Sequence, residues 1–380
     1  MKVKLSDAFD LQMGKTPPRN DRECWGDGHK WISISDIGNV GKYIDITKEE
    51  ITDIGVSKSG IKVVPKGTVI MSFKLSIGKT AITAEDMYTN EAIMAFINKG
   101  KYEIDTDYLY HMCKGIDWFE GTNKAVLGLT LNKATMSEKE IEIPSMAEQL
   151  NVVAVLDKMD ELIALRKEQL AKLDRLVKSR FIELFGDPVY NNNGLPTKKL
   201  RELGSLDRGR SQHRPRNDPK LLNGPYPLIQ TGEVASAGLY ITEYKNTYSE
   251  LGLQQSKMWK AGTLCITIAA NIAQTAILTF DACFPDSVVG FVPNDSVSAI
   301  YMHYWFGFFQ KILEEQAPQV AQKNINLKIL SDLDVMVPTK EQQEQFAAFV
   351  EQADKSKFDL KQSLEKLETL KKSLMQQYFG

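Results

Sequence analysis

The stretch between Pro144 and Gly186 constrains the fold more than any other part of the sequence. It contains no proline or glycine, the residues that most often break helices, so it predicts one long helix. A strict seven-residue apolar repeat runs through it, and such a repeat requires a partner helix in a coiled coil. The repeat consists of Leu156, Ile163, Leu170, Val177 and Leu184.

The end of the chain supplies the expected partner. Residues 338–380 align with residues 144–186 without a gap, at an offset of 194 positions. The second copy has two apolar series, and the second series is interrupted by Lys357 and Lys371. These series are Phe346, Ala353, Leu360, Leu367 and Leu374, and Val350, Leu364 and Tyr378. We therefore expect the two helices to pair. The alternative is two unrelated amphipathic helices, each packed on its own domain.

The repeat also extends into the segments that precede the helices. Gly14-Lys15-Thr16 corresponds to Gly209-Arg210-Ser211, and Thr80-Ala81-Ile82 to Thr275-Ala276-Ile277, both at an offset of 195. The sequence therefore predicts an α+β protein with an internal duplication: two similar α/β domains and two long helices. The expected boundaries are 1–143 and 187–337 for the domains, and 144–186 and 338–380 for the helices.

Alternating residues predict strands within both domains. Residues 31–37 (WISISDI) and 228–234 (LIQTGEV) each indicate a strand that ends in an acidic and an aliphatic residue. The stretch from Ala261 to Phe280 carries no charge, but its threonine, asparagine and glutamine residues make it too polar for a membrane span. We expect buried strands there instead.

Composition limits the environment and the partners. Four scattered cysteines without a CxxC pair argue against zinc and a disulfide framework, and favour a reducing cytoplasm. The start MKVKLSDAFD lacks the apolar segment of a signal peptide. The net charge of −2 and the sequence pI of about 6.2 are less basic than is usual for nucleic-acid-binding proteins.

No catalytic constellation is evident. The sequence has no GxxxxGK[ST] phosphate loop, no GxGxxG cofactor fingerprint and no HExxH metal motif, so we expect no cofactor, metal or catalytic site. His111 and His303 lie in apolar predicted helices and are interpreted as packing residues. The DPVY segment at Asp187 lacks the second proline of an amino-methyltransferase loop and is interpreted as a turn.

The polar loops are more informative, because they concentrate the residue types that contact DNA. Arginine and glutamine read base edges in the major groove, and arginine and lysine also neutralise phosphates. In the first domain the candidate DNA-binding residues are Lys15, Thr16, Arg19, Arg22, Lys74 and Lys79. In the second they are Arg208, Arg210, Gln212, Arg214, Arg216, Gln230, Asn271, Gln274, Lys323 and Asn324. The alternative interpretation is ordinary solvated surface.

This arrangement resembles the specificity subunits of type I restriction-modification systems over essentially the whole chain. The resemblance rests on the order of parts: a domain that opens KLSD…GKTP, a helix that ends LFGD, then a second domain and helix. Both helices also begin with a similar proline-to-glutamine segment, at 144–149 and 338–343. Individually these motifs are loose, but in this duplicated order they are specific.

The resemblance implies two target-recognition domains, each reading half of a bipartite site in double-stranded DNA. It also implies that the two long helices separate these domains as an antiparallel coiled coil, which relates the halves by an internal pseudo-two-fold. It implies a non-catalytic chain that recruits two adenine-methyltransferase subunits and, in restriction complexes, two motor-nuclease subunits. A helix of about 37 residues spans about 55 Å and could set the spacer between the half-sites. Two alternatives remain: the specificity component of another DNA-modification system, or a coiled-coil assembly scaffold that does not bind DNA.

Overall fold

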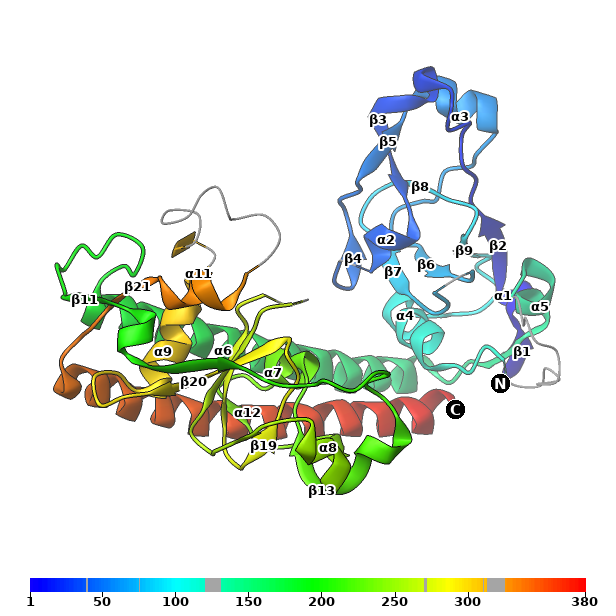
Figure 1. Cartoon of the computed structure of the whole chain (residues 1–380). Coiled ribbons are helices and arrows are strands. Elements are labelled where there is room, and N and C mark those ends of the chain that lie inside the picture. Colours follow the sequence, from blue (N-terminus) through cyan, green and yellow to red (C-terminus); the bar gives the residue numbers. More distant parts are fainter. Residues whose placement is uncertain (39, 75, 120–130, 270–271, 310, 313–324) are drawn as a thin grey trace. The chain divides into compact units, whose positions relative to one another are not determined.

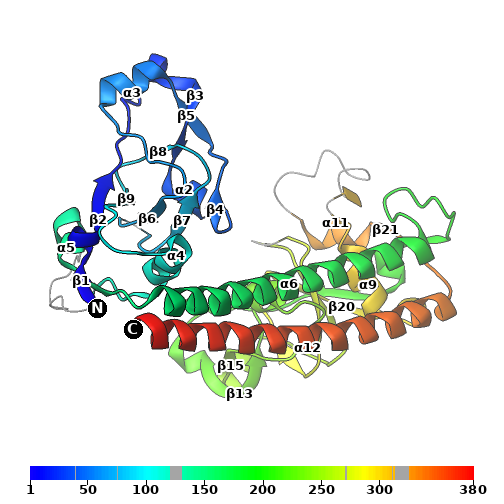
Figure 2. The ribbon, with the colours of Figure 1, turned by 180° about the vertical axis from the view of Figure 1, so that it is seen from behind.

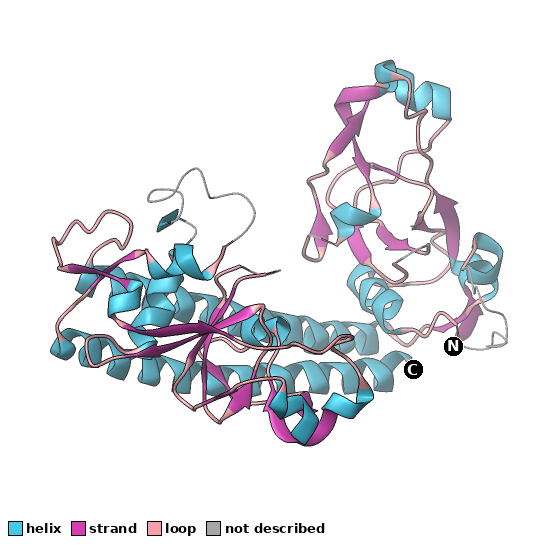
Figure 3. Cartoon of the chain, in the orientation of Figure 1, coloured by secondary structure: helices cyan, strands magenta, loops and turns pink. Residues whose placement is uncertain are grey.

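The computed structural model describes the whole chain except residues 39, 75, 120–130, 270–271, 310 and 313–324. The chain divides into two compact units, which we describe separately (Figure 1). The first unit comprises Met1–Lys167 and Gln362–Gly380, and the second comprises Glu168–Lys361. Both contain helices and strands (Figure 3). Among the described helices, none is long and apolar enough to cross a membrane.

The first unit is built on a five-stranded sheet with the order β2-β9-β6-β7-β4. These strands are β2 (Phe9–Met13), β4 (Tyr43–Ile44), β6 (Val69–Ser72), β7 (Thr80–Thr83) and β9 (Ile93–Asn98). A three-stranded sheet contains β3 (Trp25–Ile32), β5 (Glu49–Ile51) and β8 (Tyr88–Thr89), and a third sheet pairs β1 (Lys2–Lys4) with β10 (Glu140–Glu142). The shorter helices are α1 (Leu5–Ala8), η1 (Arg22–Cys24), α2 (Ile34–Ile37), α3 (Asp53–Ser59), α4 (Thr106–Gly115) and α5 (Lys133–Glu138).

The second unit repeats this plan with the order β12-β20-β17-β18-β14. Its large sheet contains β12 (Gly204–Arg208), β14 (Tyr240–Ile241), β17 (Leu264–Thr267), β18 (Thr275–Leu278) and β20 (Val288–Pro293). The smaller sheets contain β13 (Leu222–Leu228), β15 (Asn246–Tyr248), β16 (Met258–Trp259) and β19 (Ala282–Cys283), and β11 (Thr197–Lys199) with β21 (Asp334–Met336). The shorter helices are η2 (Leu200–Glu202), η3 (Pro219–Leu221), α7 (Thr231–Ser236), α8 (Glu250–Gln254), α9 (Ala299–Phe306) and α11 (Leu327–Ser331).

The two large sheets confirm the duplication at the level of strand register. Gln12 pairs with Ala95 in the first sheet, and Asp207 pairs with Gly290 in the second. Both partners of the second pair lie 195 residues after those of the first. The predicted buried strands within the uncharged stretch are β17 and β18, and every residue of both strands is buried.

The predicted long helices are α6 (Met146–Phe185) and α12 (Lys340–Phe379), each 40 residues long. Both views show them side by side (Figures 1 and 2). Within the first unit, Lys167 pairs with Glu368 at 2.9 Å, and within the second, Phe181 packs against Phe346 with ring centroids 5.4 Å apart. The direction follows within each unit: Asp160 pairs with Lys371 and Lys167 with Glu368 in the first, and Asp174 pairs with Lys357 and Phe181 with Phe346 in the second. The helices are therefore antiparallel in both units, as the family resemblance implies.

The two lysines that interrupt the apolar series are accommodated by ion pairs. Lys357 lies 2.7 Å from the carboxylate of Asp174, and Lys371 pairs with Asp160. The lysine side chains are only 15% and 17% exposed. Polar residues inside a coiled-coil seam favour one register at a cost in stability, which explains their place in an otherwise apolar pattern.

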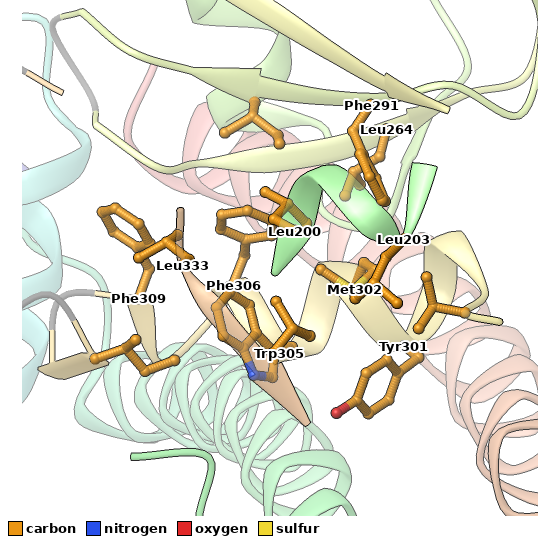
Figure 4. Close-up of a cluster of buried hydrophobic side chains, with 14 of the residues drawn as sticks. Leu200, Leu203, Leu264, Phe291, Tyr301, Met302, Trp305, Phe306, Phe309 and Leu333 are labelled. Carbon is orange, nitrogen blue, oxygen red and sulfur yellow. The ribbon is translucent and has the colours of Figure 1, made fainter. Parts of the chain in front are cut away.

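Aromatic side chains dominate the core of the second unit. Leu200 and Leu203 of the η2 segment pack with Tyr301 and Trp305 of α9 beneath the large sheet (Figure 4). Phe181 of α6 stacks on the Tyr301 ring at 5.5 Å. Fully burying one large apolar side chain contributes about 1.5–3 kcal/mol, so this cluster fixes the half of α6 that belongs to the unit.

The prediction of strands over residues 31–37 and 228–234 is correct only at the start of each segment and wrong for the rest. β3 ends at Ile32 and β13 at Leu228, and the short helices α2 and α7 follow. The acidic residues that appeared to continue the alternation stabilise the helix starts. The Ser33 N–H donates to the Asp36 carboxylate at 2.8 Å, and the Gln230 N–H donates to Glu233 at 3.2 Å. This is the capping-box arrangement.

Candidate nucleic-acid interface

Each unit carries one basic loop that leaves the first strand of its large sheet. We call residues 14–22 the first basic loop and residues 207–218 the second. A glycine anchors each loop against a neighbouring segment. A Cβ at Gly14 would clash with the carbonyl of Thr89, and a Cβ at Gly209 would clash with that of Phe284. The close approach therefore needs glycine, and it fixes where each loop begins.

Two predicted contact residues of the first basic loop have partners within the unit. The Lys15 ammonium donates to the carbonyls of Ser59 and Gly60, at 3.1 and 3.0 Å, where α3 ends. A cation is favourable at a helix C-terminus, which carries partial negative charge. The Thr16 hydroxyl donates to the Glu91 carboxylate. Both side chains therefore order the loop in this structure.

Arg19 lies on an aromatic platform. Its guanidinium carbon is 4.0 Å from the ring centroid of Trp25 and 4.8 Å from that of Trp31, and the two rings meet edge to face. One guanidinium nitrogen lies 2.6 Å from the Glu49 carboxylate. The side chain remains 50% exposed, so the guanidinium is held in place but can still be reached from solvent.

Glu91 brings three of the predicted residues together. Burial alone would raise the pKa of this carboxyl, but the Thr16 hydrogen bond and the charges of Lys74 and Arg19 lower it below the usual value. Lys74 is exposed and lies 5.3 Å from the ring centroid of Phe73. In the first unit Glu91 therefore contacts Thr16 directly and interacts electrostatically with Lys74 and Arg19, and we call these four residues the Glu91 cluster.

Arg22 and Lys79 are exposed, but no interaction within the described residues joins them to this cluster. Arg22 is the first residue of η1. Lys79 approaches Gly38 and lines a cavity of about 590 Å³ with side chains of α4 and α6. The structure therefore places Lys79 beside the long helix.

The second basic loop is arranged around Asp286. A guanidinium nitrogen of Arg216 lies 2.6 Å from the Asp286 carboxylate, and Arg208 Nε donates to the Asp286 backbone carbonyl at 3.1 Å. Two of the four predicted arginines therefore meet at one residue. Arg214 instead donates to the backbone carbonyls of Ser211 and His213, at 2.6 and 2.8 Å.

Gln255 holds the middle of the second basic loop. Its side-chain oxygen accepts hydrogen bonds from the backbone N–H groups of Gln212 and His213, at 2.7 and 3.1 Å. These contacts fix the backbone and leave the Gln212 side chain exposed. Gln255 is therefore a positioning residue for the loop.

Arg210 differs from the other arginines of the second loop. Its backbone carbonyl accepts from Ser256 at 3.0 Å, while its side chain has no hydrogen bond or ion pair with any described residue. The nearby Asp207 carboxylate is instead paired with Lys257 at 2.8 Å, and this pairing lowers the pKa of Asp207 despite partial burial. Arg210 is thus the most available cation of the loop.

The remaining candidates lie elsewhere. Gln230 is exposed at the start of α7, and Gln274 lines a cavity of about 890 Å³ with helix residues Lys178 and Lys357. No contact within the described residues joins either glutamine to the arginines. Asn271, Lys323 and Asn324 lie outside the described residues. In that described part, no cluster of three metal-ligating side chains is found.

Sequence reasoning missed the carboxylates at the centre of both loops. Glu91 and Asp286 lie 195 residues apart, the offset that relates the strands of the two large sheets. Extending that alignment past Ile82 and Ile277 would have paired them. Gln255 carries no comparable signal, because its role depends on tertiary contact alone.

Comparison with known proteins places the chain in a family. The family model for the type I restriction modification DNA specificity domain matches residues 1–175 and 192–372. The chain is 28% identical over 275 residues to the type I restriction enzyme MjaIX specificity subunit of Methanocaldococcus jannaschii, covering 67% of this chain and 62% of that protein. The chain thus matches about three fifths of that relative's length. A putative MjaX specificity subunit of the same organism is 22% identical over 87% of this chain and 82% of its own length.

Solved structures support the fold. One solved structure, which concerns the complex assembly and conformational transition of the type I restriction-modification system, contains a chain that matches this one with a TM-score of 0.66 and 17% identity. The match covers 100% of this chain and 97% of that one. The specificity subunit from M. genitalium matches with a TM-score of 0.53 and 14% identity, covering 100% and 96%. With two copies of the family domain and the fold described above, the chain belongs to the type I restriction-modification DNA specificity family.

Proposed function

We propose that this chain is the DNA specificity subunit of a type I restriction-modification complex. The observation that carries the proposal is the duplication: the same sheet occurs twice, and a basic loop follows its first strand at equivalent positions in both copies. A duplicated scaffold with different loops suits a bipartite site, because each copy can read its own half. The proposed recognition domains are residues 1–143 and 187–337.

The contact surface in this proposal is the basic loops with their neighbouring lysines and glutamines. Exposed arginine and lysine side chains supply the phosphate contacts that dominate affinity for double-stranded DNA. Arg19, stacked on two tryptophans, presents donors with restricted orientation, and Gln212 extends an exposed side chain from a fixed backbone. Ordered donors are suited to base reading, because a bidentate contact depends on geometry.

The proposed partners are two adenine-methyltransferase subunits and, in a restriction complex, two motor-nuclease subunits. The long helices, proposed as residues 144–186 and 338–380, would set the spacer and dock the methyltransferases. The chain itself is proposed to be non-catalytic. Four cysteines, all buried free thiols, agree with function in a reducing cytoplasm.

Methylome sequencing of cells with and without this gene tests the proposal. A split adenine motif should be methylated only when the gene is present. An assembly scaffold that does not bind DNA would leave the methylome unchanged, and the purified chain would show no dependence of duplex affinity on salt. A methylated motif without two separated halves would contradict the bipartite assignment.

A further inference from the structure

The contact between Arg216 and Asp286 is exposed and therefore exchangeable. The Asp286 side chain is 41% exposed and that of Arg216 is 48% exposed. Ion pairs at such positions contribute about 0–1 kcal/mol, since water and salt screen them. A carboxylate and a DNA phosphate accept from a guanidinium in the same bidentate manner. The Asp286 carboxylate thus occupies a position that a phosphate could take on Arg216.

The first unit also has a carboxylate at the equivalent position, although its loop sequence is different. Glu91 corresponds to Asp286, and it accepts the Thr16 hydroxyl of the first basic loop. Both carboxylates come shortly after a strand of the smaller sheet, β8 and β19. In both units an acidic residue at this position therefore contacts the basic loop, through an arginine ion pair in the second unit and a threonine hydroxyl in the first.

We propose that Asp286 is an internal counter-charge that competes with DNA phosphate for Arg216 and so weakens sequence-independent binding. The inference rests on the proposed DNA-binding function. Such a counter-charge would help a sequence-specific protein, because phosphate contacts provide nearly all of the non-specific affinity for DNA. If Asp286 competes for Arg216, one of these contacts is weakened and binding to the wrong sequences is reduced.

Counterion exchange gives the inference a measurable form. A cation that binds one phosphate releases about 0.9 counterion from duplex DNA. In the wild-type chain, Arg216 must first leave Asp286, and added salt favours this step because it screens the exposed ion pair. The two effects of salt therefore partly offset each other. Removing the carboxylate charge should make the slope of log affinity against log salt steeper, by up to about 0.9.

The test compares Asp286→Asn with Asp281→Asn in the full chain. Asparagine preserves the shape and the backbone carbonyl that Arg208 uses, and it removes only the charge. Asp281 is a matched control: it is 43% exposed, pairs with Lys260 at 2.7 Å, and its replacement changes the net charge equally. Affinity for a random-sequence duplex is measured between 50 and 200 mM salt.

We expect D286N to bind more tightly than the wild-type chain, with a gain that is larger at 50 mM than at 200 mM salt, by a factor of up to about 3.5. D281N should match the wild type, and the gain should vanish when Arg216→Ala is added to D286N. Equal slopes for D286N and D281N, or a gain that persists without Arg216, would overturn the inference and leave the proposed function intact. Weaker D286N binding confined to duplexes with one particular base would also overturn it, by assigning Asp286 to base reading.

A wild-type chain that binds no duplex at any salt, together with an unchanged methylome, contradicts the proposed function itself.

Discussion

The arginines of the second basic loop have the same side chain but different roles in the fold. Arg216 and Arg208 meet at Asp286, and Arg214 donates to two carbonyls of its own loop. Arg210 alone among the four has a side chain without such a partner in the described residues. Replacing these arginines should therefore have different consequences, and the cleanest phosphate probe is Arg210.

Arg210→Ala should weaken binding to cognate and scrambled duplexes by the same factor and make the salt slope shallower by about 0.9. The reason is that the substitution removes one phosphate contact, while the Arg210 side chain makes no hydrogen bond or ion pair with the described residues that could be lost at the same time. Lys260→Ala is the control, since that lysine is 83% exposed and pairs with Asp281 in the same unit. Unchanged affinity and slope for Arg210→Ala would make this residue ordinary surface. A loss of discrimination at a single base pair would instead assign it to base reading.

His303 makes stability depend on pH. Burial lowers its pKa from 6.5 to about 4, and its Nδ1 lies 3.0 Å from the Thr275 hydroxyl. The folded state therefore binds the proton less readily than the unfolded chain. Its contribution to stability is complete above pH 6.5 and declines as the pH falls toward 4. At pH 5.5 the loss should be about 1 kcal/mol relative to pH 7.5.

Urea unfolding of His303→Leu at these two pH values should show a smaller pH difference than the wild type. If the wild type and His303→Leu lose the same stability between pH 7.5 and 5.5, another group is responsible.

Residue types predicted the basic loops, but they could not predict the partners of each side chain. The charge of Lys15 predicts a DNA contact, yet its ammonium caps the end of α3. The equivalent loops predict a DNA contact for Lys79, yet this lysine lines a cavity beside α6. Such partners depend on segments distant in sequence that tertiary folding brings together, and local pattern does not encode them.

At the scale of elements, one buried glutamine joins each long helix to its unit. Gln149 Oε1 accepts from the Asp105 N–H at 2.9 Å, and its Nε2 donates to the carbonyls of Glu103 and Pro144, both at 3.0 Å. Gln343 repeats all three bonds in the second unit, from the start of α12. These glutamines fasten the first turns of the helices to the chain just before α4 and α9.

Gln343→Ala should lower the free energy of unfolding by about 2–4 kcal/mol, because it leaves three backbone groups without a partner: the buried Pro338 carbonyl and the partly buried Ser298 N–H and Ser296 carbonyl. The neighbouring Gln342→Ala is the control. Its side chain accepts one hydrogen bond, from the Thr339 N–H at 3.1 Å, so its loss should cost at most about 1 kcal/mol. Chemical denaturation measures both. Equal losses would show that the buried glutamine does not fasten the helix.

The sequence predicted elements best where the pattern was long. The seven-residue repeat identified both helices, since no other regular structure satisfies that spacing over forty residues. It predicted least where elements were short. Residues 34–37 form a single helical turn whose start depends on one capping carboxylate, and alternation over so few residues does not separate a turn from a strand.

At the scale of the whole molecule, a net charge of −2 is compatible with DNA binding, because the basic loops are compensated internally. Arg19 pairs with Glu49, Arg216 with Asp286, and Lys257 with Asp207. Average charge therefore conceals two local concentrations of cations. This arrangement suits a protein that must reject most sequences, since a uniformly basic surface would bind all of them.

The duplication predicts that the two recognition domains can be exchanged independently. The side chain of Gln149, which fastens the first domain to α6, bonds only to backbone atoms, at Glu103, Asp105 and Pro144. It should therefore tolerate a different domain sequence. Replacing residues 1–143 with the corresponding domain of another family member should alter one half of the methylated motif and leave the other half unchanged.

Methylome sequencing of cells that carry the exchanged chain measures this outcome. The reciprocal exchange of residues 187–337 is the control, and it should alter only the other half. The expected independence follows from the structure of the repeat: each basic loop is anchored by its own glycine and compensated by its own carboxylate, within its own unit. A change in both halves after a single exchange, or in neither, would show that the two loops do not read separate half-sites.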